Sequence, residues 1–154
     1  MSQANKDLVR KYLEKVDTGD VGVLDTYLDV GYDDHNPPPF QRGNDLDAVR
    51  GAFTYALGVF SDFSHEVLAQ YSDGDYVISR IVGRGRHTGE FLGIPPTGKD
   101  VSMEGITIHR VVDGQITVTG SAVPEPSSLA LAATALLLGL AHARHQRSRG
   151  SFIQ

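Results

Sequence analysis

The N-terminal part of the chain has apolar residues at helical spacing, namely Leu8, Val9, Tyr12, Leu13 and Val16. This spacing places them on one face of an amphipathic helix. The segment Asp17-Thr18-Gly19-Asp20 ends the pattern, and Asp20 is placed to cap a second helix over roughly residues 21–28. The chain is therefore predicted to begin with two helices, the second of them short.

A third helix is predicted after the prolines at positions 37–39. Consecutive prolines donate no backbone hydrogen bonds and push the residues before them out of the helical region, so we expect irregular structure there. Asn44, followed by Asp47, can cap the helix that comes next. Its apolar face is predicted to consist of Leu46, Val49, Phe53, Leu57 and Phe60.

From Ser64 the pattern changes to β-strands. The pairs Asp73-Gly74 and Asp113-Gly114 each lie between β-forming segments, which predicts two hairpin turns. Helices come first and hairpin-linked strands follow, an order that indicates an α+β fold rather than a parallel βαβ design. Helices packed on one face of a curved antiparallel sheet would enclose an apolar interior suited to a small ligand.

Composition narrows the class of protein. With 154 residues, 40% hydrophobic and 21% charged, the chain has the size and texture of one globular domain. The formal net charge of -5 gives no reason to expect a nucleic-acid partner. The chain has no cysteine, which excludes thiol catalysis, disulfides and thiolate metal sites.

The charge balance changes near residue 123. Residues 1–123 carry 11 Lys and Arg against 18 Asp and Glu, whereas residues 124–154 carry three arginines and one glutamate. Within the second part, residues 129–143 are apolar on every side of a helix, and at 1.5 Å per residue they would span roughly 22 Å, less than the roughly 30 Å of a bilayer core. We therefore predict a domain over residues 1–123 and a hydrophobic helical tail over 124–154.

Five motifs give the first part a family resemblance. They are VRKYLEKV, TGDVGVLDTYL, DDHNPPP, HTGEFLGIPPTGK and GITIHRVVDGQI, in this order. Over roughly residues 3–118 the chain thereby resembles the SnoaL-like polyketide cyclase (ester cyclase) family of the NTF2-like superfamily. The resemblance implies a cone-shaped α+β barrel, a homodimer formed through the outer sheet face, and a polyketide-like or other small apolar carbonyl ligand. It also implies ring closure of an ester by intramolecular aldol condensation, with no metal and no cofactor. A non-catalytic binding or surface protein of the same fold is the alternative.

Three histidines are the candidate catalytic residues. Aldol chemistry needs a group that removes a proton from a carbon acid, and histidine titrates near neutral pH. The resemblance implies pocket positions for His35 and His87. The alternatives are a loop residue that holds the proline-rich backbone, for His35, and an ordinary strand-end residue, for His87. Thr107 stands where cyclising family members commonly have an aspartate, and its hydroxyl does not ionise near neutral pH. His109 shares the strand face of Thr107 and either replaces the carboxylate or packs in the core.

The predicted substrate-binding residues are mainly aromatic: Tyr12, Phe53, Leu57, Phe60, Phe91 and Thr107. For those on helices the alternative is ordinary core packing. The loop HTGEFLGIPPTGKD either rims the pocket or forms a stiff connection. Three arginines at even spacing form either an anion-binding wall or a solvated strand face: Arg80, Arg84 and Arg86. The histidines lack metal-ligand spacing, and Gly83-x-Gly85 lacks the rest of a dinucleotide fingerprint.

The C-terminal part resembles a PEP-CTERM sorting signal. Pro124-Glu125-Pro126, an apolar stretch and a basic end follow one another. This resemblance implies membrane contact through residues 129–143 and removal of the tail during export. The N-terminus reads as a charged amphipathic helix and shows no signal peptide, which predicts a cytoplasmic protein instead. An inert fusion and a C-terminal helix packed on the domain are the other interpretations.

Overall fold

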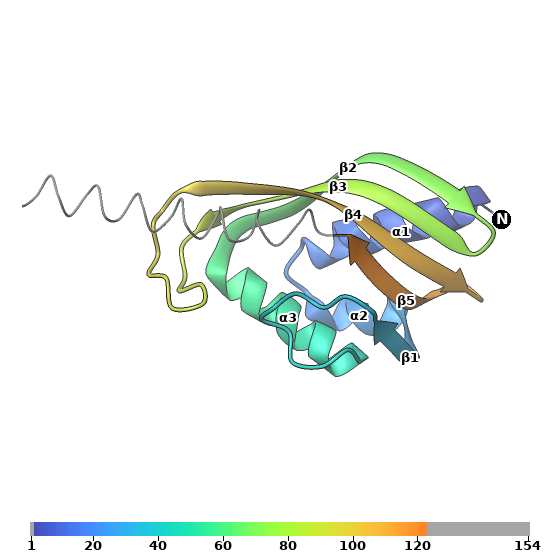
Figure 1. Ribbon diagram of the computed structural model, residues 1–154, viewed down its shortest axis with the longest axis horizontal. Coiled ribbons are helices and arrows are strands. Elements are labelled where there is room, and N and C mark those ends of the chain that lie inside the picture. The colour runs from blue at the N-terminus through green and yellow to red at the C-terminus, as the bar shows by residue number, and fades with distance from the viewer. Residues whose placement is uncertain (1, 123–154) are drawn as a thin grey trace, which may run out of the picture. The chain divides into compact units, whose positions relative to one another are not determined.

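The computed structural model describes residues 2–122, and the side chains of residues 3–120 (Figure 1). Residues 1–123 form one compact unit. The predicted tail helix and its apolar stretch 129–143 lie outside the described residues. Between residues 2 and 122, no helix has the length and apolar character needed to cross a membrane.

Along the described chain the helical elements and strands are α1 (Ser2–Val16), η1 (Val21–Val23), α2 (Leu24–Tyr27), β1 (Leu28–Asp34), α3 (Leu46–Val59), β2 (Phe60–Asp73), β3 (Tyr76–His87), β4 (Asp100–Val112) and β5 (Gln115–Ala122). The helices precede four of the five strands, as predicted, but strand β1 lies between α2 and α3.

The five strands form one sheet in the order β1-β5-β4-β3-β2. The pairs β2–β3, β3–β4 and β4–β5 are antiparallel, whereas β1 is parallel to β5. The helices cover one face of the sheet (Figure 1). The α+β prediction is therefore confirmed, but the sheet is mixed rather than purely antiparallel. The segment that forms β1 was expected to be irregular. Its pairing with β5 joins Leu28 to Ile116, and such a distant pairing leaves no local pattern in the sequence.

Helix α1 carries the predicted apolar stripe into the core. Val9, Tyr12, Leu13 and Val16 are buried, and Leu8 packs against them. The predicted second helix is a 3-10 turn followed by one α-helical turn. Asp20 caps it as predicted, since its carboxylate accepts a hydrogen bond from the backbone of Gly22 at 2.9 Å.

Helix α3 begins one residue later than its predicted cap implied. Asp45, not Asn44, is the N-cap, and its carboxylate accepts from the backbone N–H of Ala48 at 2.8 Å. The Asn44 amide instead donates to Asp33 in the neighbouring strand. The buried stripe of the helix consists of Val49, Ala52, Ala56 and Val59. Of the predicted face, Leu46 and Phe53 pack against the core from partly buried positions, whereas Leu57 and Phe60 are half-buried, and Phe60 already belongs to β2.

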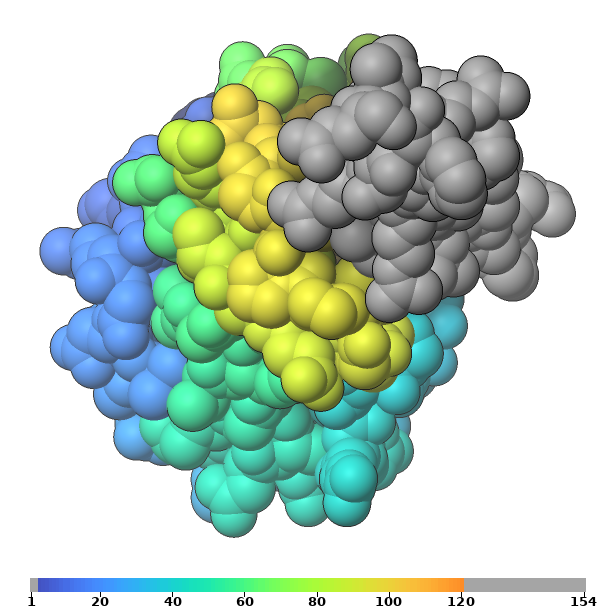
Figure 2. Space-filling view, turned by 90° about the vertical axis from the view of Figure 1, so that its left-hand side faces the viewer, coloured from blue at the N-terminus to red at the C-terminus, as the bar shows by residue number. Residues whose placement is uncertain are grey.

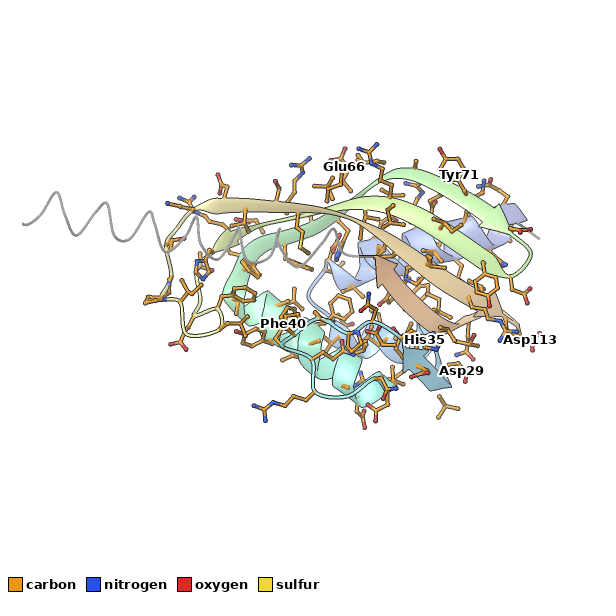
Figure 3. The ribbon with its side chains drawn as sticks, viewed as in Figure 1. Asp29, His35, Phe40, Glu66, Tyr71 and Asp113 are labelled. Carbon is orange, nitrogen blue, oxygen red and sulfur yellow. The ribbon has the colours of Figure 1, made fainter. Side chains whose placement is uncertain are left out.

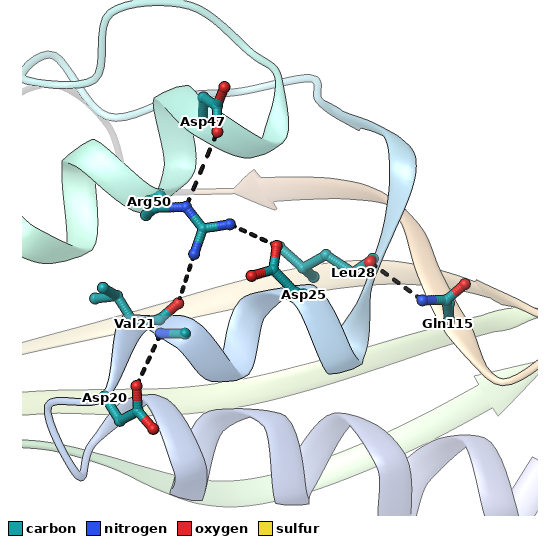
Figure 4. Close-up of polar contacts among 8 residues, drawn as sticks. Asp20, Val21, Asp25, Leu28, Asp47, Arg50 and Gln115 are labelled. Atoms are coloured by element: carbon teal, nitrogen blue, oxygen red, sulfur yellow. Dashed lines mark hydrogen bonds and ion pairs between the residues drawn. The ribbon is translucent and has the colours of Figure 1, made fainter.

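Arg50 connects α3 to the preceding short helices (Figure 4). Its guanidinium donates to the carbonyl of Val21 at 3.0 Å and to the carboxylate of Asp25 at 2.6 Å. Asp47, one turn earlier on α3, lies 3.9 Å from the Arg50 Nε. One half-buried cation thus holds three chain segments together.

Both predicted hairpin turns are present. Gly74 has φ +54, and Asp113 and Gly114 have φ +50 and +80. Positive φ at these positions is the backbone geometry for which Asp-Gly turns are selected. Strand β2 begins at Phe60, four residues before the predicted start. The sequence pattern did not show this early start, because a bulge centred on Asp62, with φ +54, interrupts the alternation of the strand.

The outer face of the sheet carries charges and exposed apolar groups. Arg84 donates to Glu66 at 2.9 Å, Arg80 pairs with Glu104, and Arg86 donates to the Gly98 carbonyl at 2.9 Å. Figure 3 shows Glu66 on this side of the sheet, opposite the helices. Because these arginines are engaged by neighbouring acceptors, the structure favours the solvated strand face over the anion-binding wall.

Candidate active site

A row of polar residues crosses three adjacent strands on the helix-covered face of the sheet. Asp34 at the end of β1 is opposite Thr119 of β5, and Thr119 is opposite His109 of β4. With neighbouring strands roughly 4.8 Å apart, the Cα atoms of Asp34 and His109 are separated by roughly 10 Å. Asp34 and His109 are buried, at 7% and 2% exposure.

Three side-chain polar atoms in and beside this row are buried without a hydrogen-bond partner: Thr107 Oγ1, His109 Nδ1 and Thr119 Oγ1. Thr107 and His109 alternate along β4, opposite the fully buried Ser79 and Val77 of β3. The three atoms therefore belong to one patch. Because leaving a buried polar atom unpaired costs free energy, such a patch indicates a place where a ligand's polar groups would bind.

Two tyrosines border the patch. Tyr12 of α1 meets the His109 ring edge-on at a centroid distance of 5.9 Å. Tyr32 precedes Asp34 by two residues, so both side chains point to the buried face of β1. Burial raises the pKa of Tyr12, and the neighbouring Tyr32 and Asp34 raise it further. Burial also raises the pKa of Tyr32, although the nearby Thr119 side chain partly opposes this effect. Both phenols consequently keep their protons at neutral pH and can donate hydrogen bonds.

His109 is an uncharged imidazole under ordinary conditions. Burial lowers its pKa from 6.5 to about 4, because the charged form loses its hydration inside the protein. At neutral pH the ring can therefore accept a hydrogen bond at one nitrogen and donate from the other.

His35 lies beyond the row, in the loop after β1 (Figure 3). Its side chain is 61% exposed and its Nε2 lies 3.0 Å from Asp33 Oδ2. Its backbone N–H donates to the Thr119 carbonyl at 2.8 Å and so extends the β1–β5 pairing. His35 lines an open crevice of about 630 Å³ together with Asp33, Asp34, Pro37, Gly43 and Asn44. This crevice reaches Asp34 from solvent.

His87 is buried, at 1% exposure, at the opposite end of β3. Its Nδ1 lies 3.0 Å from Thr97 Oγ1, while its buried Nε2 has no partner. His109 is opposite Val77, and nine residues of β3 lie between Val77 and His87, a length of roughly 33 Å measured along an extended strand. The structure therefore does not bring His87 and His109 to one site.

An aromatic cluster surrounds His87. Phe60 and Phe91 lie 5.8 and 6.5 Å from its ring, and Phe40 and Tyr55 complete the cluster against Phe91. Figure 2 shows the β3–β4 loop, in yellow, against α3, in green. Val59 accepts hydrogen bonds from the backbone of both Thr88 and Gly89, at 2.9 and 2.8 Å. These contacts support the interpretation of the loop as a stiff connection.

The predicted substrate-binding residues accordingly fall into two groups. Tyr12 and Phe53 meet edge to face at 6.5 Å near His109. Thr107 belongs to the same group because it lies two residues before His109 on the same face of β4. Phe60 and Phe91 belong to the cluster at His87, with centroids 5.4 Å apart. Leu57 is half-buried on α3.

Asp34, Tyr32 and Thr119 line or adjoin this row and were not among the predicted site residues. The signal was present in the sequence, since Tyr32 and Asp34 alternate, but it has meaning only once β1 is known to be a strand. No group of three His, Asp or Glu side chains among the described residues is arranged to hold a metal ion.

The arrangement defines a class of protein: a small α+β domain whose helices cover a sheet face lined with neutral polar groups, one buried carboxylate and aromatic rings. The chain belongs to the SnoaL-like polyketide cyclase family, whose model matches residues 6–122. The PEP-CTERM protein-sorting motif matches residues 122–147. Both resemblances seen in the sequence are thereby confirmed.

Relatives and solved structures agree with this assignment. Aklanonic acid methyl ester cyclase DauD of Streptomyces sp. (strain C5) is 37% identical over 116 residues, covering 71% of this chain and 70% of DauD. Nogalonic acid methyl ester cyclase of Streptomyces nogalater is 32% identical over 104 residues, covering 64% and 75%. The crystal structure of IdmH from Streptomyces antibioticus superposes with a TM-score of 0.72 at 26% identity, covering 82% of this chain and 96% of IdmH.

Proposed function

We propose that this protein catalyses cofactor-independent proton transfer, either intramolecular aldol cyclisation or a related reaction, on a small apolar carbonyl or ester compound. The observation that carries the proposal is the patch of buried polar atoms without partners: Thr107 Oγ1, His109 Nδ1 and Thr119 Oγ1. A carbonyl oxygen, and the enolate that forms from it, would accept hydrogen bonds from these groups.

His109 is the proposed acid/base histidine. It is buried beside Tyr12, and its lowered pKa keeps it neutral, so that it can exchange a proton or a hydrogen bond with a bound carbonyl compound. His35 and His87 are weaker candidates, because His35 is paired with Asp33 at the surface and His87 lies at the far end of β3. We propose Tyr12, Phe53 and Thr107 as ligand contacts near His109, and Leu57, Phe60 and Phe91 as contacts for a ligand that extends towards His87.

Aklanonic acid methyl ester is the proposed test substrate, because relatives at 37 and 36% identity carry the name of its cyclase. The full chain would be incubated with this ester, and ring closure followed by chromatography. We expect His109→Gln to lower kcat/KM by roughly 10²- to 10⁴-fold, the usual contribution of a general acid or base. His35→Gln and His87→Gln serve as matched histidine controls. Unchanged turnover in His109→Gln would remove the role proposed for this residue.

A non-catalytic binding protein of the same fold is the second candidate function, and Thr107 favours it. A hydroxyl stands where the family resemblance implies a carboxylate. Under this alternative the wild-type chain binds the ester without converting it, and Thr107→Asp gains no activity. Conversion of the ester by the wild type would contradict it.

We also propose a homodimer formed through the outer face of the sheet. This face presents the apolar side chains of Ile106 and Ile108, which are 42 and 39% exposed. An exposed apolar strip of this kind is typical of an interaction surface. Sedimentation of the wild type and of Ile106→Lys tests the proposal: we expect a dimer that the lysine dissociates, and a wild-type monomer would refute it.

The C-terminal motif supports a proposal about location. Because residues 122–147 match a protein-sorting motif, we propose that residues 129–143 contact the membrane before the tail is removed. Membrane fractions of cells that express the full chain should contain it, whereas the fractions should lose it when residues 124–154 are deleted. Equal distribution of both proteins would contradict the proposal.

A further inference from the structure

Asp34 is the only buried carboxylate among the side chains of residues 3–120. It is the last residue of β1, on the same face as Tyr32, and it is paired with Thr119 of β5. Thr119 in turn is paired with His109 of β4. It also lines the crevice that opens to solvent. Asp34 therefore lies between the crevice and the row of buried polar residues.

The hydrogen bonds of Asp34 hold its carboxylate in place and leave acceptor capacity free. Oδ1 accepts from the backbone of Asn36 and Oδ2 accepts from the Gln41 amide, both at 3.1 Å. A carboxylate has about four acceptor sites, so about two remain. A base that is oriented by two donors and still has free lone pairs is suited to removing a proton from a bound carbon acid.

We infer that Asp34, rather than His109, is the general base of the proposed reaction and replaces the carboxylate that Thr107 does not supply, while His109 hydrogen-bonds to the substrate. The inference rests on the proposed function. The Asp34 carboxylate takes a proton from a carbon next to a carbonyl, and the electron pair of that C–H bond becomes an enolate. The enolate carbon bonds to a second carbonyl carbon of the same molecule, whose oxygen becomes an alkoxide. This alkoxide takes the proton back from Asp34, so that no proton or electron is gained or lost overall.

The roles of the two sides of the site then differ. The patch formed by Thr107, His109 and Thr119 is neutral and offers hydrogen bonds to the enolate oxygen, while the charge needed for proton removal lies on Asp34. The other ionisable groups that face this space are Tyr12 and Tyr32, which stay protonated because burial raises their pKa values. Asp33 and His35 pair with each other outside it.

The test compares Asp34→Asn with two matched variants in the aklanonic acid methyl ester assay. Asp33→Asn changes the adjacent carboxylate, which is 44% exposed, and Gln41→Ala removes one hydrogen bond to Asp34 but keeps the carboxylate. We expect kcat/KM to fall roughly 10²- to 10⁴-fold in Asp34→Asn and less than about tenfold in the other two. Added formate should restore part of the activity of Asp34→Ala, which a purely structural role would not allow.

Three outcomes overturn the inference. Unchanged turnover in Asp34→Asn would leave the proposed function standing without Asp34 as base. Equal losses in Asp34→Asn and Gln41→Ala would assign Asp34 to loop positioning. No conversion by the wild type would remove both the proposed function and this inference. If Asp34→Asn does not fold, the pH profile of His109→Gln decides: an acidic limb of kcat/KM that persists supports Asp34, and its disappearance excludes it.

Discussion

The buried imidazole of His109 makes the stability of the fold depend on pH, and His109→Gln is the variant that isolates its effect. Burial lowers the pKa of His109 from 6.5 to about 4. In the unfolded chain the ring is hydrated and titrates near its ordinary value. Glutamine is of similar length, hydrogen-bonds as the neutral imidazole does, and cannot take up a proton.

The sign and size of the effect follow from this difference in pKa. Between pH 6.5 and 4 the unfolded state binds more protons at His109 than the folded state does, so acid favours unfolding. The contribution of the neutral ring is fully present above pH 6.5 and is lost as the pH falls through 4. A difference of roughly 2.5 pH units at about 1.4 kcal/mol per unit corresponds to about 3 kcal/mol.

Urea unfolding, followed by far-ultraviolet circular dichroism from about pH 8 to about pH 4, measures this effect. Other groups titrate in the same range, so the relevant quantity is the difference between wild type and variant. We expect the free energy of unfolding of the wild type to fall by about 3 kcal/mol more than that of His109→Gln. His35→Gln, with its 61% exposed side chain, should parallel the wild type. Parallel curves for wild type and His109→Gln would refute the reasoning.

Two further predictions concern stability and use matched pairs of variants. A Cβ on Gly89 would lie 2.4 Å from the Gly58 carbonyl oxygen, so Gly89→Ala should destabilise by about 1–3 kcal/mol, whereas Gly51→Ala in open space on α3 should stabilise by about 0.5–1 kcal/mol. Arg50→Met should cost about 1–3 kcal/mol because the Val21 carbonyl and the Asp25 carboxylate lose their half-buried donor, and Arg84→Met, in an exposed pair, less than about 1 kcal/mol. Urea unfolding checks both; equal effects within either pair would contradict the reasoning.

The parts of the fold that were predicted correctly depend on local patterns. The stripe of α1 follows helical periodicity, and the turns at residues 73–74 and 113–114 follow from the left-handed conformation that Asp-Gly pairs adopt. The errors lie where distant contacts decide. Strand β1 forms because β5 pairs with it, and the start of β2 is hidden by the bulge at Asp62.

The candidate site was predictable only in part for the same reason. Alternation along one strand correctly placed Thr107 and His109 on the same face. Their alignment with Asp34 depends on the register of three strands, which no single segment of sequence contains. The predicted grouping of His87 with the other histidines depends on how the two ends of β3 are placed in space, which no local pattern in the sequence contains.

A catalytic carboxylate can act from more than one strand of this site, provided that it faces the bound molecule. A base on β4, where the family resemblance implies an aspartate, and a base on β1 can face the same bound molecule from two sides, because β5 alone separates the two strands. Placing the negative charge on β1 keeps it away from the oxygen on which negative charge develops, while the neutral groups of β4 and β5 stay near that oxygen. Under the proposed function, Thr107 is then a hydrogen-bond donor, and the loss of an aspartate at this position is compatible with activity. If Asp34 is the base, Thr107→Asp should therefore have a lower kcat/KM than the wild type, since the new negative charge would repel the enolate.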